Sequence, residues 1–208
     1  MTTTGVQARH LFIMTMTMTM TMTMGMSKRW LDECAKRAQW IREGGLVLDD
    51  GYSQVDKRAH AVLADINALG FITADSQEGK GKNKGTRERA YVHGWLPKAS
   101  LKRFLAALNQ ASGVVAWAYS PVGSYPSGAN GVTSLPVTLD SNGEAVTRAH
   151  MLATAEEIAG QAKLAKLARF KGSIAMVECV DAVWGRLAFQ PGGLFLAVRN
   201  ALASLSDR

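Results

Sequence analysis

Residues 26–208 predict an α+β fold, in which helices pack on a mixed sheet of about five strands. Apolar residues recur at helical spacing in several segments, and short apolar runs bounded by Gly and Pro lie between them. The two kinds of segment alternate without a regular strand–helix–strand repeat. Hydrophobic residues make up 47% of the 208 residues, which is enough for the core of one domain. We therefore expect a single α/β domain over residues 26–208.

Residues 1–25 have the composition of a low-complexity segment. Met and Thr alternate without interruption from Met14 to Met24, and no small-residue cleavage site of a signal peptide follows. A six-base tandem repeat in the gene would produce this pattern, because Met has a single codon. We expect the segment to be disordered or to precede the true start of translation, for which Met1, Met24 and Met26 are the candidates.

Capping residues and apolar spacing predict five helices. They cover approximately residues 27–43, 53–69, 100–112, 154–170 and 191–205. Ser27 and Ser100 are the expected first residues of two of them, and Ser53 with Asp56 forms a capping box. Gly70 follows the second helix, where a glycine commonly ends a helix.

Five short apolar segments predict the strands. They cover residues 71–74, 87–96, 114–119, 132–139 and 173–180. Pro136 predicts that its strand lies at a sheet edge, since proline lacks the N–H that a central strand uses. Asp140 to Gly143 predicts a turn, and Asp75 to Thr86 predicts a polar loop.

Charge and cysteine content exclude several classes of protein. The net charge is +7, which favours weak attraction to polyanions but indicates no particular function. Cys34 and Cys179 lie far apart without metal-ligand spacing, so we expect no disulfide, metal or cofactor and a reducing, cytoplasmic location. No long uninterrupted apolar run is present, so we expect no membrane span.

The predicted loop from Asp75 to Thr86 is the leading candidate site. Its glycines allow backbone N–H groups to approach an anion, and Lys80, Lys82 and Lys84 add positive charge. The spacing of a phosphate-binding P-loop is absent. A solvated hairpin is the alternative, and it applies more to the lysines than to Asp75, Ser76 and Gln77, which come directly after a predicted strand.

The next predicted strand adds a second group of candidates. Arg87, Arg89, Tyr91 and His93 share one face by alternation, and such a face can hold a phosphate or carboxylate. An exposed sheet face is the alternative. The Trp184 to Arg186 segment follows another predicted strand, so we expect Trp184 and Arg186 to converge with Gln77, Arg89 and Tyr91 at one sheet edge.

Three short stretches resemble an uncharacterised group of small bacterial and phage proteins. They are Gly70 to Gln77, Arg89 to Gly94, and Asp181 with Trp184 to Arg186. The resemblance implies a phage or bacterial accessory protein and assigns it no activity. The Thr73 to Gln77 piece is also similar to part of the regulatory domain of methylenetetrahydrofolate reductase, where a Pro often stands in place of Glu78. That domain binds S-adenosylmethionine, which implies a nucleoside-type ligand.

Three functions remain open at this point. The first is a binding module for a small anionic or nucleotide-like ligand. The second is a nucleic-acid-associated protein, for which the basic candidates are Lys80, Lys82, Lys84, Lys163, Lys166, Arg169 and Lys171. The third is a small hydrolase-like enzyme acting through Asp75, Ser76 and His93. The sequence leaves the oligomeric state open.

Overall fold

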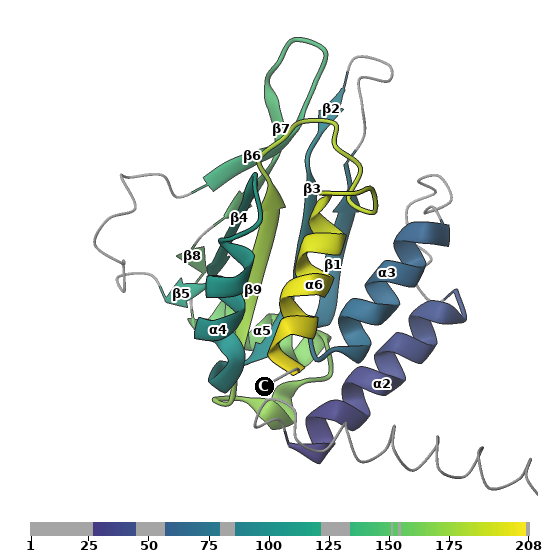
Figure 1. Ribbon diagram of the computed structural model, residues 1–208. Coiled ribbons are helices and arrows are strands. Elements are labelled where there is room, and N and C mark those ends of the chain that lie inside the picture. The colour runs from purple at the N-terminus through teal and green to yellow at the C-terminus, as the bar shows by residue number, and fades with distance from the viewer. Residues whose placement is uncertain are drawn as a thin grey trace, which may run out of the picture.

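Helices and strands combine into an α+β fold, which confirms the predicted fold class (Figure 1). The computed structural model describes residues 27–44, 57–79, 86–121, 134–150, 152–153 and 155–206. The helices in these ranges are α2 (Lys28–Arg42), α3 (Lys57–Ala68), α4 (Lys98–Leu108), α5 (Ala155–Leu164) and α6 (Leu194–Ser206), with a short 3-10 helix, η2 (Ala168–Phe170). None of the helices in this part of the chain has the length and hydropathy to cross a membrane.

The main sheet is antiparallel and has four strands in the order β1-β3-β9-β4. Its strands are β1 (Ile72–Glu78), β3 (Ala90–Pro97), β9 (Ile174–Asp181) and β4 (Val114–Ala118). A second antiparallel sheet has the order β2-β6-β7, and β5 pairs with β8 in parallel. These smaller strands are β2 (Arg87–Glu88), β6 (Ser134–Leu139), β7 (Ala145–His150), β5 (Ser120–Pro121) and β8 (Leu152–Ala153). The strands are thus divided among three sheets, where the sequence predicts one mixed sheet.

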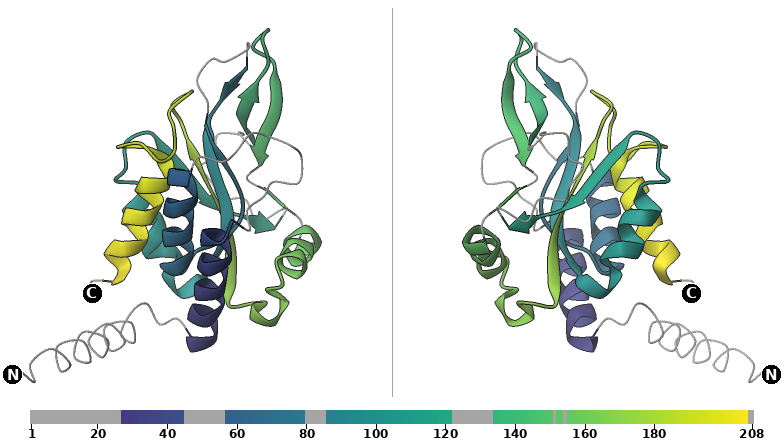
Figure 2. Two further views of the ribbon diagram at one scale, coloured as in Figure 1. Left: turned by 90° about the vertical axis from the view of Figure 1, so that its right-hand side faces the viewer. Right: turned by 90° about the vertical axis from the view of Figure 1, so that its left-hand side faces the viewer.

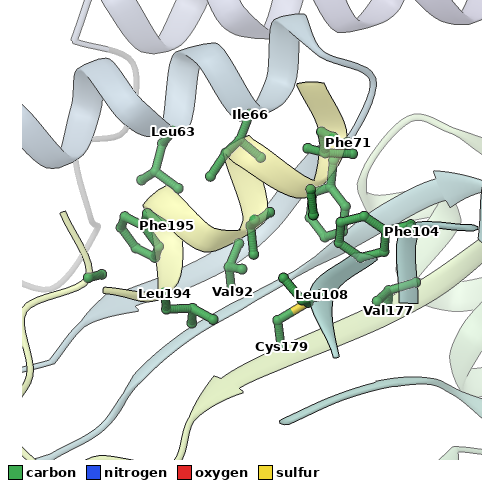
Figure 3. Close-up of a cluster of buried hydrophobic side chains, with 14 of the residues drawn as sticks. Leu63, Ile66, Phe71, Val92, Phe104, Leu108, Val177, Cys179, Leu194 and Phe195 are labelled. Carbon is green, nitrogen blue, oxygen red and sulfur yellow. The ribbon is translucent and has the colours of Figure 1, made fainter. Parts of the chain in front are cut away.

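Helices α3, α4 and α6 cover one face of the main sheet (Figures 1 and 2). Their apolar sides meet alternate residues of the central strands, such as Val92 of β3 and Cys179 of β9 (Figure 3). The apolar residues that repeat at helical spacing in α6 are all buried, namely Leu194, Phe195, Val198, Leu202 and Leu205. This face holds the principal core, which we call the helix face.

The opposite face of the sheet is covered in parts. Helix α5 and η2 lie over one end of it (Figure 2), where Trp95 and Met176 pack with Phe170 in a second apolar cluster. Toward the other end, Val137 of β6 packs on Val180 of β9. The residues between these two clusters, on what we call the open face, form the candidate site described below.

Two predicted boundaries around β1 and α4 are wrong. The loop predicted to begin at Asp75 is strand as far as Glu78, because β1 pairs with β3 along its whole length. β1 is the outer strand of the sheet, and polar and charged side chains are common in outer strands. Ser100 is not the first residue of its helix, since Pro97 precedes α4 and Ser100 is buried inside it.

The prediction that Pro136 marks an edge strand is also wrong, because β6 is the middle strand of its sheet. β2 pairs only with Thr138 and Leu139, so at Pro136 the paired neighbour is β7 alone. The missing N–H of Pro136 therefore removes no bond to β2. The turn predicted at Asp140 is confirmed, and the Asp140 carboxylate accepts hydrogen bonds from the backbone N–H of Asn142 and Glu144.

Gly94 of β3 is required by close packing against the neighbouring strand. A Cβ atom there would overlap the carbonyl oxygen of Ile72 and the ring of Phe71. We expect Gly94→Ala to lower the free energy of unfolding by about 2 kcal/mol, as other overpacked cores do. Chemical denaturation measures the change.

Gly160→Ala is the matched control for this substitution. Gly160 lies in α5 with no atom close to an added Cβ, so the control should stabilise the protein by up to about 1 kcal/mol. Equal effects of the two substitutions would contradict the packing described at Gly94.

Candidate functional site

A line of polar side chains crosses the open face of the main sheet. Asp75 of β1 lies opposite His93 of β3, and His93 lies opposite Glu178 of β9. Residues directly opposite in an antiparallel pair point to the same face. We call Asp75, His93 and Glu178, together with the tyrosines Tyr91 and Tyr119 that contact them, the polar row.

A register shift between Thr73 and Asp75 places Asp75 in this row. Thr73 pairs with Gly94 and Asp75 pairs with His93, so Ala74 is an extra residue in β1. With regular alternation Asp75 would share the face of Thr73, and the bulge moves it to the opposite face. The row therefore depends on one irregularity in the edge strand.

Asn67 of α3 holds the strand just before this bulge. Its amide oxygen accepts from the Thr73 backbone N–H at 3.1 Å, and its amide nitrogen donates to the Thr73 hydroxyl at 2.9 Å. The same nitrogen also donates to the Leu63 carbonyl at 2.8 Å. Because Asn67 and Thr73 are both buried, these bonds fix the register of β1 against the helix.

Each carboxylate of the row accepts a hydrogen bond from a tyrosine. The Tyr91 hydroxyl donates to Asp75 Oδ2 at 2.6 Å, and the Tyr119 hydroxyl donates to Glu178 Oε2. The rings of His93 and Tyr119 are 5.5 Å apart between centroids. These contacts form two groups, Asp75 with Tyr91 and Glu178 with Tyr119 and His93, and the groups adjoin where Asp75 lies opposite His93.

The two carboxylates differ in exposure and in acidity. Asp75 is exposed, whereas the exposed fraction of Glu178 is only 5%. Burial raises the pKa of Glu178 to about 7; the Tyr119 hydrogen bond acts in the opposite direction, and the charge of Asp75 raises it further. Glu178 therefore exchanges its proton near neutral pH.

Burial also changes the other titratable groups of the row. It lowers the pKa of His93, although the Asp75 charge acts in the opposite direction, so His93 is neutral at neutral pH. It raises the pKa of Tyr91 and of Tyr119, and the nearby carboxylates add to this effect. Both phenols therefore keep their protons and remain hydrogen-bond donors.

Three buried nitrogen atoms in the short segment 89–95 lack a hydrogen-bond partner. They are Arg89 Nε, His93 Nε2 and Trp95 Nε1, among five such side-chain atoms in the described residues. The others are His60 Nε2 on α3 and Ser100 Oγ on α4. Buried polar atoms are paired in most proteins, so three unpaired atoms between Arg89 and Trp95 call for a physical reason.

The remaining sequence candidates are divided between several places. Arg89 donates to the Pro136 carbonyl and lies over the Trp184 ring, 4.1 Å from its centroid, while Gln77 donates to the Arg89 carbonyl. Arg186 is held by two hydrogen bonds, of 2.6 and 2.7 Å, to the buried carboxylate of Asp181. Arg186 therefore stabilises the loop that follows β9. Gln77, Arg89 and Trp184 lie together near the N-terminal end of β3.

Ser76 and Arg87 lie apart from the polar row. Ser76 is opposite Val92, whose side chain belongs to the core of the helix face, so Ser76 and His93 point to opposite faces. A catalytic arrangement of Asp75, Ser76 and His93 is therefore not formed. Arg87 pairs with Leu139 in the second sheet and is exposed.

The basic candidates that the structure describes are not members of the polar row. Lys163, Lys166, Arg169 and Lys171 are exposed around the end of α5 and η2, and Arg169 forms an ion pair with Glu33. Lys80, Lys82 and Lys84 lie outside the described residues, as do residues 1–25 and the Ser53 capping box. Within the described ranges no cluster of His, Cys, Asp and Glu has the geometry of a metal site.

Sequence reasoning missed Glu178, Tyr119 and Trp95. A single Glu inside the apolar segment 174–180 was the available signal for Glu178, since a carboxylate is rarely buried without a purpose. Tyr119 follows directly after β4, and its role depends on pairing that the sequence does not reveal.

The raised pKa of Glu178 predicts a specific dependence of stability on pH. The folded protein holds this proton more tightly than the unfolded chain, whose Glu has the ordinary pKa of 4.5. The free energy of unfolding should therefore fall as pH rises from about 4.5 to about 7 and level off above. The fall is on the order of 3 kcal/mol, at about 1.4 kcal/mol per pKa unit.

Glu178→Gln should remove this component, which urea denaturation at about pH 5 and about pH 8 measures. The free energy of unfolding of the variant, relative to that of the wild type, should be higher at about pH 8 than at about pH 5. A relative stability that is the same at both would show that Glu178 does not titrate in this range.

No curated protein matches this chain. One family model matches residues 26–205, and that family, DUF6919, is described as a domain of unknown function. The resemblance to an uncharacterised family is confirmed to this extent. The chain belongs to the DUF6919 family.

Proposed function

We propose that this protein binds a small nucleotide-like molecule along the open face of β3. The observation that carries the proposal is the pair of unpaired buried nitrogens Arg89 Nε and His93 Nε2. A buried donor left without a partner costs about 1–3 kcal/mol, and a ligand that accepts its hydrogen bond removes this penalty.

The chemistry of these nitrogens indicates what the ligand offers. The Nε atom of Arg89 only donates a hydrogen bond, so the ligand must present an acceptor there, such as a phosphate, carboxylate or carbonyl oxygen or a ring nitrogen. Same-face neighbours along a strand are separated by roughly 7 Å. Arg89 and His93 are two such steps, or roughly 14 Å, apart. This is too far for one small ion, and an extended molecule suits them better.

The charges along β3 favour one orientation of the bound ligand. Arg89 is a cation held in place by Trp184 and by the Pro136 carbonyl, so an anionic group is favoured at its end. The carboxylates of Asp75 and Glu178 disfavour an anion further along, beside His93. The ligand is then negative at one end and uncharged but polar at the other, as a nucleoside monophosphate is.

AMP, adenosine and inorganic phosphate are suitable probes, with binding measured by isothermal titration calorimetry. We expect AMP to bind more tightly than adenosine or phosphate alone. Arg89→Gln should weaken AMP binding by roughly 10- to 100-fold, the usual value of a hydrogen bond to a charged group. Arg89→Gln should weaken adenosine binding less, because adenosine lacks the anionic group.

Arg87→Gln is the matched control, because Arg87 is exposed two residues away in β2 and should leave AMP binding unchanged. Absence of AMP binding, or equal losses in both variants, would contradict the proposal. If the protein instead binds RNA, with an affinity that falls steeply as salt rises and is unchanged in Arg89→Gln, nucleic-acid binding by the basic surface of α5 and η2 is favoured.

A further inference from the structure

We propose that the polar row transfers a proton on the bound molecule, with Glu178 as the group that takes and returns it. The substrate class is a small carbonyl or heteroaromatic compound with a removable C–H or N–H proton. This inference rests on the proposed function, because it places the uncharged end of the ligand beside Glu178.

The position of Glu178 is the first reason for this assignment. It stands between His93 and Trp117, its partners on the two neighbouring strands, and Tyr119 binds one of its two carboxylate oxygens. Apolar clusters flank it along the strand, with Met176 on one side and Val180 on the other. A carboxylate so enclosed is poorly solvated and is a stronger base than one in water.

The unpaired nitrogen of His93 is the second reason. His93 lies directly opposite Glu178, and its buried Nε2 has no partner among the described residues. A neutral imidazole nitrogen either donates or accepts a hydrogen bond, so it can hold a substrate atom that gains or loses charge as the proton moves. A purely structural histidine at this position would be expected to have its buried nitrogen paired.

The chemical step needs no further reagent. Glu178 removes a proton from one substrate atom, and the electron pair of that bond moves into the adjacent double bond. The protonated Glu178 returns a proton to another atom of the same molecule. The net reaction is a prototropic shift, so no oxidant, reductant or second substrate is consumed.

The other charged and titratable groups around Glu178 act as positioning residues. Asp75 on β1 is exposed, is held by Tyr91 and raises the pKa of Glu178 through its charge, whereas the Tyr119 hydroxyl lowers it. The proton-transfer proposal therefore predicts opposite shifts in the pH dependence of the reaction rate. Asp75→Asn should move the rise in rate to lower pH, and Tyr119→Phe should move it to higher pH.

Nitrobenzisoxazole is a direct probe of such a base. Removal of its ring C–H proton breaks the N–O bond and releases a coloured nitrophenolate, so one proton transfer is read by absorbance. We expect turnover by the wild type to exceed that by Glu178→Gln by roughly 100-fold or more. The rate should rise with pH about an apparent pKa of about 7. Glu144→Gln, which changes an exposed hairpin residue, should behave as the wild type.

Binding of the unreactive analogue nitrobenzotriazole separates this inference from the proposed function. If the analogue binds the wild type and folded Glu178→Gln but turnover is equal in both, proton transfer by Glu178 is overturned and small-molecule binding stands. If the analogue does not bind and no turnover occurs, the substrate class and with it the inference are overturned. The proposed function is judged separately, by AMP binding to the wild type and to the Arg89→Gln and Arg87→Gln variants.

Discussion

The extra residue in β1 at Ala74 is the constraint on which the candidate site depends. It changes the register between β1 and β3, so that Asp75 reaches the same face as His93 and Glu178. The Asn67–Thr73 hydrogen bonds hold the strand before it. Bulges of this kind commonly re-aim a side chain next to a functional site.

Strand β3 serves two purposes because its side chains alternate. Val92 and Leu96 complete the core beneath α3, α4 and α6, while His93 lies on the open face and Trp95 packs in the second apolar cluster. Burying Glu178 and leaving three nitrogens unpaired both lower stability. The well-packed helix face offsets this loss. Natural proteins keep such locally unfavourable groups mainly where a function uses them, which is the physical basis for placing the site here.

The sequence predicted the helices α2 and α6 well, because their apolar residues repeat at helical spacing. It also placed Tyr91 and His93 on one face, since alternation within a regular strand is simple. It failed at Ser76, because it assigned this residue to a loop, whereas Ser76 lies in β1 opposite Val92 and points to the helix face. It missed Glu178 because a lone Glu in an apolar strand gains meaning only from its partners across the sheet, Tyr119 and His93.

An NMR titration of labelled glutamate carboxyl carbons tests the central claim most directly, namely that Glu178 is a buried base in the polar row. We predict one carboxyl signal with a pKa of about 7 that is absent from Glu178→Gln. The same signal should titrate at lower pH in Asp75→Asn, because the Asp75 charge is then lost. If every glutamate titrates near about 4.3, the value for a solvated side chain, the account of this site is contradicted.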